Sequence, residues 1–212
     1  MDYDVITEGV KKAFDTFVQN IVAYIVGVLI AIIGSIFIIT IAPLFYGLYY
    51  MAIKGARGEQ VEIKDVFYGF SSIGVIIRSW IGFLVVGLIS AIIGFIVGFI
   101  IGFILGLVIV AVPSLALMVS LLSMIVSLIV SIIIQIFLFY TMYIYIMTPS
   151  ENILYALKES VDIGKSNILM VFLTILISGI LSIFIITMPL GSLFAVYVLK
   201  ELKPELKDGS GL

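Results

Sequence analysis

Residues 90–106 read SAIIGFIVGFIIGFILG, a segment without charge that has a small residue at every fourth position. It lies inside a 72-residue stretch, 79–150, that contains no Asp, Glu, Lys or Arg. A helix crosses the roughly 30 Å hydrocarbon core of a bilayer with about 20 apolar residues. The stretch therefore predicts two or more membrane-spanning helices, and it decides the class of the protein.

The rest of the chain has the same character. Two further stretches, 21–53 and 167–199, also lack charged residues. Of the 212 residues, 63% are hydrophobic and 11% are charged, and the mean hydropathy is +1.36. A soluble domain keeps about a quarter of its residues charged in order to cover its core. We expect an integral, multi-pass protein of the cell membrane.

The apolar runs favour helices over a membrane β-barrel. A barrel strand alternates polar and apolar residues over about 10 positions, whereas residues 36–39 and 132–134 are apolar on both faces. Lipid also requires every backbone N–H and C=O to be satisfied within the segment, which a helix achieves alone. The predicted fold class is an all-α integral membrane protein with about four long transmembrane helices plus interfacial amphipathic helices.

Composition also bears on chemistry. A net charge of −2 gives no basic patch for a nucleic-acid partner. The chain has no cysteine and no histidine, the usual sources of thiolate nucleophiles, metal ligands and general bases. We predict no catalytic residues, no metal and no cofactor, and a protein that is not an enzyme.

The central stretch predicts an antiparallel hairpin of two spans, 79–112 and 114–147, that reverses at Pro113. Folding the chain there brings small or polar residues on the two helices face to face, namely Ser90, Gly94, Gly98, Gly102 and Gly106 against Ser123, Ser127, Ser131 and Gln135. Small residues let helix backbones approach within a membrane. We expect this glycine zipper to close the hairpin; in the competing interpretation the glycines face another subunit.

The flanking regions predict further elements in a single membrane domain. Amphipathic interfacial helices are expected over 5–19, 61–70 and 149–163, the last with a Thr148 N-cap and its end at Gly164. The remaining spans are expected over 21–50 and 167–197, with Pro43 and Pro189 as kinks or hinges. Residues 200–212 are expected to form a flexible tail.

Two parts of the chain match each other. Residues 11–40 align without gaps on residues 158–187, and the hexapeptide SIFIIT occurs in both, at 35–40 and 182–187. Three polar positions match in the same register, Lys11 with Lys158, Asp15 with Asp162 and Asn20 with Asn167. We therefore predict an internal repeat, in which an amphipathic helix leads into an apolar segment. The same six polar residues are the candidates for contact with lipid headgroups or ions.

The topology has two interpretations. Four continuous spans would put both termini and the Pro113 turn on one side of the membrane, with 54–65 and 158–165 on the other. Lysine and arginine are then nearly balanced between the two sides, so the positive-inside rule does not choose an orientation. Alternatively, the first and last apolar segments are re-entrant hairpins bent near their prolines. Every charge then lies on one side, and the hairpins form wedges that can curve the membrane.

Short motifs resemble a known group of proteins. They are Arg57-Gly58-Glu59, the segment 65–70 (DVFYGF), the mid-chain Pro113 and the segment 156–160 (ALKES). In these the chain resembles a family of prokaryotic multi-pass membrane proteins that includes the membrane region fused to some glycerophosphodiester phosphodiesterases. The resemblance implies a helical membrane region; these 212 residues include no phosphodiesterase domain, so it does not imply that activity.

Two functions are compatible with these patterns. The first is a non-enzymatic scaffold, assembly or membrane-organising component that acts through helix packing and lipid contact. Its partners would be membrane lipids, a membrane protein or further copies of the chain. The second is a small oligomeric channel or transporter in which the stripe 94–106 lines or packs the symmetry axis.

Overall fold

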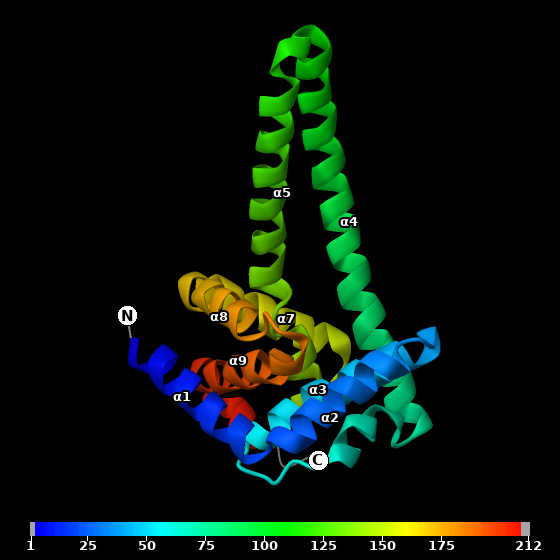
Figure 1. Ribbon diagram of the computed structural model, residues 1–212, viewed down its shortest axis with the longest axis vertical. Helices are drawn as coiled ribbons and strands as arrows, with labels where there is room; N and C mark the ends of the chain where they lie inside the picture. Colours follow the sequence, from blue (N-terminus) through cyan, green and yellow to red (C-terminus); the bar gives the residue numbers. More distant parts are fainter. Residues whose placement is uncertain (1–2, 209–212) are drawn as a thin grey trace.

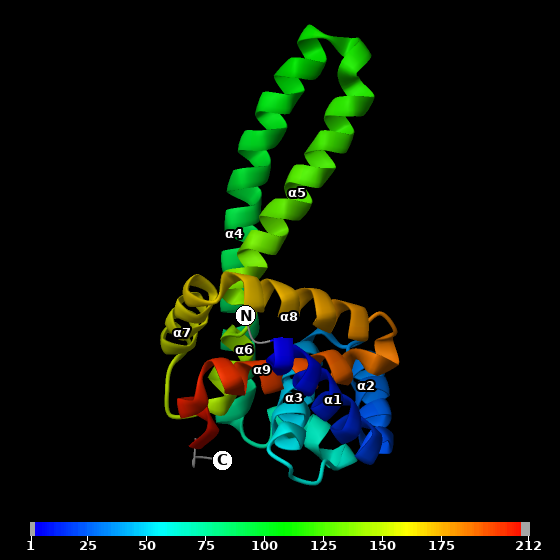
Figure 2. The same cartoon turned by 90° about the vertical axis from the view of Figure 1, so that its left-hand side faces the viewer.

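The computed structural model describes residues 3–208, and these contain helices and no strand. The chain forms a body of packed helices and a long helical hairpin, which we call the arm (Figures 1 and 2). Four helical stretches are long and apolar enough to cross a membrane, namely Ile38–Ala56, Ile73–Ala111, Ala116–Met147 and Ile185–Leu202. The predicted all-α membrane fold is confirmed.

The arm consists of α4, Ile73–Ala111, and α5, Ala116–Leu138, joined by the short 3₁₀ helix η2, Pro113–Leu115. The Ser72 hydroxyl caps α4 by accepting the Val75 N–H at 3.2 Å. At 1.5 Å per residue, the 39 residues of α4 extend about 58 Å. No residue in the most apolar window of α4 is buried by protein, against 56% in that of α3, Ile38–Ala56. Lipid is therefore the expected cover for the arm.

The first part of the body comprises α1, Tyr3–Gln19, then α2, Ile21–Gly34, and then α3. The chain bends by 85° between α1 and α2. Helices α2 and α3 run antiparallel, because the Tyr24 hydroxyl donates to the Met51 carbonyl at 3.3 Å while Gly34 faces Leu44 near the turn. A Cβ atom at Gly27 would lie 2.9 Å from the flexible end of the Met51 side chain, so the two helices pack closely there.

The last part of the body repeats this plan. Helix α7, Ile153–Ser166, bends by 106° into α8, Ile168–Leu181. The chain then reverses through η3, Ile185–Thr187, into α9, Met188–Leu202. A Cβ atom at Gly191 of α9 would lie 2.5 Å from the Ser178 carbonyl oxygen of α8, so these helices also pack closely. The bounds of α8 are those of α2 displaced by 147 residues, the offset that aligns the two SIFIIT hexapeptides.

The prediction that 21–50 and 167–197 each form one continuous kinked helix is wrong. The chain breaks and folds back at residues 35–37 and 182–184, several residues before Pro43 and Pro189. Pro43 lies within α3, where it has no N–H to donate to the Ile39 carbonyl. That carbonyl instead accepts the Trp80 indole N–H at 3.3 Å. Pro189 lies in the first turn of α9, where a missing N–H costs nothing. Neither proline is the hinge.

The two parts of the body meet where α1 packs on α9. Gly9 faces Phe194, and the Thr16 and Tyr197 hydroxyl groups are 2.7 Å apart. The shared core includes large side chains with less than 2% of their surface exposed, among them Tyr24, Met51, Tyr140, Phe194 and Leu199. Helix α6, Thr141–Met147, continues α5 into this core after a break at Phe139 and Tyr140.

The segment expected as an interfacial helix over 61–70 is the 3₁₀ helix η1, Ile63–Phe70, and it packs on α3. A Cβ atom at Gly47 would lie 1.8 Å from the Val66 carbonyl oxygen, so this contact requires glycine. Asp65 is buried, and it accepts hydrogen bonds from the Lys54 ammonium and the Glu62 N–H, each at 2.8 Å. Burial of Val66 and Asp65 makes η1 part of the body.

Two predicted helix ends are also wrong. Helix α7 is capped by Asn152, whose side chain accepts the Tyr155 N–H at 3.0 Å, while the Thr148 hydroxyl donates back to Ile144 and finishes α6. The helix continues past Gly164, because that glycine serves packing: a Cβ there would lie 2.7 Å from the Ile136 carbonyl oxygen.

Part of the expected tail is packed. Residues Pro204–Asp208 form the 3₁₀ helix η4, and Leu206 is buried. The final part of that predicted tail, 209–212, lies outside the described residues.

Candidate membrane-contact surfaces

Both chain reversals carry the SIFIIT hexapeptide, and both present its apolar side chains outward. We call residues 35–39 and 182–186 the first and second tips. In the first tip, Ile36, Phe37, Ile38 and Ile39 are 76%, 67%, 74% and 72% exposed. In the second tip, Ile183, Phe184, Ile185 and Ile186 are 68%, 69%, 63% and 46% exposed. A soluble surface rarely gathers so many bare apolar side chains in a turn.

The N–H groups that begin each tip are hydrogen-bonded within the chain. In the first tip, the N–H groups of Ser35, Ile36 and Phe37 donate to carbonyls of the preceding turn of α2. In the second tip, Ser182 and Ile183 donate in the same way. The hydroxyl groups also point inward: Thr40 donates to Phe37 at 2.7 Å, and its counterpart Thr187 donates to Phe184 at 2.8 Å.

These internal hydrogen bonds lower the cost of placing the turn in hydrocarbon. Lipid offers no water to solvate free backbone groups, so an irregular turn is expensive there unless its polar atoms are paired. Several backbone N–H groups of the tips donate hydrogen bonds within the chain, and the tips carry no charge. Their isoleucine and phenylalanine side chains are exposed. Their chemistry therefore fits insertion into one leaflet.

The body helices lie across the base of the arm, and α8 lies on the side from which the arm projects (Figures 1 and 2). Helix α8 carries no charged residue, and its exposed side chains are Ile168, Leu169, Leu176 and Ile180. Helix α2 is likewise uncharged, with Val22, Leu29, Ile32 and Ile33 exposed. The apolar surface of the body thus continues from the tips along both outer helices.

The charged candidates for headgroup contact occupy equivalent places. Lys11 and Asp15 are exposed on α1, and Lys158 and Asp162 are exposed on α7. The buried faces of these helices also correspond, with Gly9, Ala13 and Phe17 matching Ala156, Ser160 and Gly164. No ion pair of the described residues joins Lys11 to Asp15 or Lys158 to Asp162; on α1 the pair is Lys12 with Glu8, at 2.8 Å.

Asn20 and Asn167 lie at the bends between the amphipathic and apolar helices. The Asn20 amide donates to Thr16, and its carbonyl oxygen accepts the Val61 N–H at 3.1 Å. The Asn167 amide donates to Ile163 at 3.5 Å. Asn20 therefore has a local role: it ties the first bend to the loop before η1.

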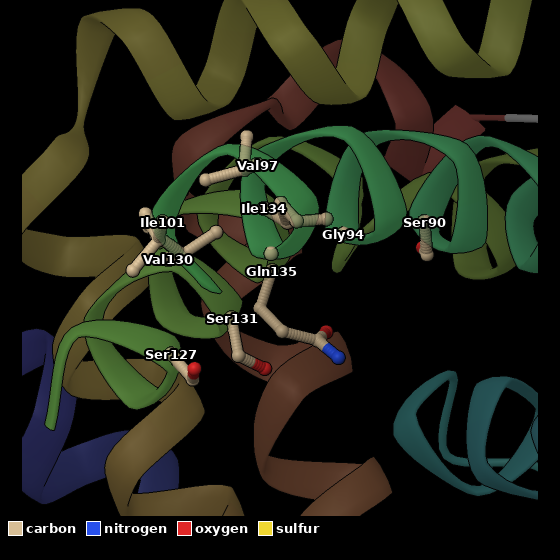
Figure 3. A pocket seen from close by; sticks show the side chains of 10 residues that line it. Ser90, Gly94, Val97, Ile101, Ser127, Val130, Ser131, Ile134 and Gln135 are labelled. Atoms are coloured by element: carbon tan, nitrogen blue, oxygen red, sulfur yellow. The ribbon is translucent and has the colours of Figure 1, made fainter. Parts of the chain in front are cut away.

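A cavity lies between the two helices of the arm. A cavity of about 180 Å³ between α4 and α5 is lined by Ser90, Gly94 and Gly98 on one helix and by Ser127, Ser131 and Gln135 on the other (Figure 3). At the base of the arm, a Cβ atom at Gly82 of α4 would lie 2.9 Å from the Met142 side chain of α6, so α4 packs closely on α6 there. Small residues of α4 and α5 therefore line the same gap between the two helices, on the faces that the sequence pattern predicts.

The expected glycine packing is absent. A Cβ atom added at Gly94, Gly98, Gly102 or Gly106 would meet nothing within 4 Å. The cavity lining also includes Val97, Ile101, Val130 and Ile134, which Figure 3 shows among the small residues. These branched side chains share the facing surfaces with the small residues. The stripe lines a gap and does not close the hairpin.

Residue-by-residue analysis of the sequence did not single out the tips as a site. The signal was present in the repeated SIFIIT, because a serine and a threonine that recur around four apolar residues are suited to a turn with internal hydrogen bonds. Pro43 and Pro189, which follow the hexapeptides, predict a kink within a continuous helix instead.

Comparison of the chain with protein-family models, curated proteins and solved structures finds no match. The resemblance to the membrane region of some glycerophosphodiester phosphodiesterases therefore stays a prediction. The class of protein rests on the fold, which is that of an all-α membrane protein with an exposed apolar arm and two exposed apolar tips.

Proposed function

We propose that this protein is a non-enzymatic, membrane-organising component of the cell membrane. The arm crosses the bilayer and anchors the chain. The two tips, with the outer faces of α2 and α8, enter the leaflet on the side of the body. The observation that carries this proposal is the pair of tips, each with four exposed apolar side chains and an internally hydrogen-bonded turn.

Insertion from one side has a mechanical consequence. Amphipathic elements that enter only the outer part of a bilayer respond to its curvature and lipid packing. Two tips in one leaflet add volume to that leaflet, while the arm adds equally to both. The protein would therefore favour membrane that curves away from the body.

The similarity of residues 11–40 and 158–187 supports the same proposal. We infer that residues 11–40 and 158–187 descend from one duplicated unit, an amphipathic helix followed by an apolar hairpin. The exposed charged residues of α1 and α7, among them Lys11, Asp15, Lys158 and Asp162, would lie at the headgroups while the tips lie deeper. Each unit supplies one wedge, and two wedges displace more lipid than one.

Vesicle shape tests the proposal. Wild-type protein reconstituted into large liposomes is expected to yield smaller or tubular vesicles by electron cryo-microscopy. A variant with Phe37→Asn and Phe184→Asn should leave the vesicles at their original size, because it weakens both tips and keeps the arm. A matched control, Phe95→Asn and Phe103→Asn in the exposed arm, changes two equally apolar side chains outside the tips. Wild-type vesicles that keep their size and shape would contradict the proposal.

A small oligomeric channel or transporter is the second candidate. The observation that favours it is the cavity between α4 and α5, whose lining includes Ser127, Ser131 and Gln135 on successive turns of one helix. Several copies could join such stripes around an axis. Ion flux through liposomes that Gly98→Leu abolishes would support a channel, whereas liposomes that stay tight at every ionic condition would refute it.

A further inference from the structure

Segments that four continuous spans would place on opposite sides of the membrane are in contact in the body. The Lys200 ammonium donates to the Ala56 carbonyl at 2.9 Å, and Lys203 forms an ion pair with Glu159. Both contacts join the end of the chain to a segment that four spans would put on the other side. Polar groups in contact cannot be separated by the roughly 30 Å hydrocarbon core of a bilayer. The contacts therefore require that the chain turns back at the tips without crossing the membrane.

The basic residues consequently lie on one side of the arm. The chain has 11 lysines and arginines, all of them among the described residues, and none lies in the stretch 79–150. The turn of the arm, residues 112–115, is at the end farthest from the body (Figures 1 and 2). This turn has no charge, and apolar side chains beside it, Val110 and Leu117, are 81% and 76% exposed. The distribution is thus 11 basic residues at the body and none at the turn.

Such a distribution sets the orientation of a membrane protein. Cytoplasmic segments carry an excess of lysine and arginine, and the residues that count lie within about 20 residues of a span. Four basic residues lie within 15 residues of the uncharged stretch 79–150, namely Lys64, Arg78, Lys158 and Lys165. Acidic residues contribute little to this rule, so the 13 aspartates and glutamates of the chain do not offset the bias. Four continuous spans gave a nearly balanced count, whereas the contacts of the body give a decisive one.

We propose that the body faces the cytoplasm, that the turn of the arm faces the opposite side, and that both tips enter the cytoplasmic leaflet. This inference rests on the proposed function, because the arm must cross the bilayer for the two sides to differ. It adds the partner of the tips, which is the leaflet with the more negative surface potential. Exposed lysines such as Lys11 and Lys158 then lie at the leaflet whose anionic lipids attract them.

The orientation also gives the membrane curvature a direction. Tips that add volume to the cytoplasmic leaflet make that leaflet convex. The membrane then bulges toward the cytoplasm, as an invagination does. The opposite orientation would make it bulge away from the cytoplasm.

Cysteine labelling of intact bacterial spheroplasts tests the orientation. Because the chain has no cysteine, Ser114→Cys in the turn and Glu59→Cys in an exposed loop of the body each give a single reactive site. A membrane-impermeant maleimide is added before or after the membrane is opened with detergent. We expect Ser114→Cys to react in intact spheroplasts and Glu59→Cys to react only after the membrane is opened.

The other labelling patterns separate this inference from the proposed function. Glu59→Cys that reacts in intact spheroplasts, with Ser114→Cys protected, would overturn the orientation and leave the wedge proposal standing. Reaction of both cysteines from the same side would show that the arm does not cross the membrane, and both proposals would fail.

Moving positive charge from the base of the arm to its turn tests the cause of the orientation. In the Ser114→Cys chain, three exposed lysines near the arm become glutamine and three exposed apolar residues near the turn become lysine. The changed positions are Lys64, Lys158 and Lys165 for glutamine, and Val110, Val112 and Leu117 for lysine. Labelling in intact spheroplasts, as a fraction of labelling after opening, should be lost, because the basic residues now favour the turn on the cytoplasmic side.

The matched control carries the same three glutamines, with glutamate in place of each added lysine. It has as many charges in the turn, and acidic residues contribute little to orientation, so its turn should still react in intact spheroplasts. Equal labelling of the lysine and glutamate variants would overturn the assignment of the body to the cytoplasm by its basic residues.

Discussion

A single aspartate in the first tip should expel that tip from the membrane. The four side chains Ile36 to Ile39 are 67–76% exposed to the surroundings of the protein. Full burial of such a side chain contributes about 1.5–3 kcal/mol, so each still has about 1–2 kcal/mol to gain from lipid. The tip as a whole would gain about 4–8 kcal/mol by insertion.

Ile38→Asp removes one of these contributions and adds the cost of a charge in the membrane. That cost is about 2.5–3.5 kcal/mol at the bilayer centre, which is its upper limit for a shallow wedge. The total change of about 4–5 kcal/mol is comparable with the whole gain from insertion. At about 1.4 kcal/mol per factor of ten, this change corresponds to a shift of about 1,000- to 4,000-fold in the equilibrium for insertion.

The assay uses the absence of cysteine from the chain. A cysteine placed at residue 36 carries a nitroxide label, and its collision rates with oxygen and with a water-soluble nickel chelate report depth. We expect the label to meet oxygen and avoid nickel in the parent protein, and to meet nickel after Ile38→Asp. The equivalent change in the other tip, Ile185→Asp, is the matched control and should leave the label at 36 buried.

The result that would refute this reasoning concerns the parent protein. A label at residue 36 that is as accessible to nickel as a label at the exposed Lys12 would place the tip in water. The apolar side chains of the tips would then need another partner, and the wedge proposal would fail.

Three further predictions concern stability. Gly98→Ala should leave the unfolding temperature in detergent unchanged or slightly raised. The added Cβ atom meets nothing, and alanine favours a helix over glycine by about 1 kcal/mol. Loss of the folded arm, measured by circular dichroism, would show instead that the glycines pack against another helix. Gly47→Ala should prevent stable folding, since its Cβ would lie 1.8 Å from the Val66 carbonyl oxygen, and wild-type thermal stability would contradict the close contact of α3 and η1. Asp65→Ala should destabilise the protein by about 3 kcal/mol, because it leaves Lys54 unpaired in a mostly buried place. The control is Lys64→Ala, at the more exposed pair with Glu62, which should change stability by less than about 1 kcal/mol.

Much of the fold follows from the sequence, and the reasons are local. Uncharged stretches of more than 20 residues identify membrane helices, and the four-residue spacing of Ser90, Gly94 and Gly98 fixes which face of α4 meets α5. The alignment of 11–40 on 158–187 also locates corresponding helices, since α2 and α8 share their bounds at the same offset.

The prediction fails where distant contacts decide the structure. A stripe of glycines permits close approach but does not enforce it, and the branched Val97 and Val130 lie on the same faces as the stripe. From the sequence, Pro43 predicts a kink, because it leaves the Ile39 carbonyl without its helical partner. In the structure the indole N–H of Trp80, 37 residues away from Pro43, donates to that carbonyl. The reversal at 35–37 depends on helix pairing in the body, such as Gly27 against Met51.

The tips could have been predicted from the sequence. The hexapeptide SIFIIT occurs at both tips, and one of the two predicted topologies makes the first and last apolar segments re-entrant. The length of each uncharged segment is equally compatible with one continuous span and with two short antiparallel helices.

The central claim is that the charged parts of the body all lie on one side of the membrane, with the tips dipping into the near leaflet. Single cysteines at four exposed positions, Lys12, Glu59, Lys165 and Glu205, and one at Ser114 in the turn of the arm, test it directly. The sided reaction is measured with a membrane-impermeant maleimide on oriented vesicles. We expect the cysteines at Lys12, Glu59, Lys165 and Glu205 to react from the same side of the membrane. The cysteine at Ser114 should react from the other side. Reaction of Lys12, Ser114 and Glu205 from one side, with Glu59 and Lys165 reacting from the opposite side, would establish four continuous spans and contradict it.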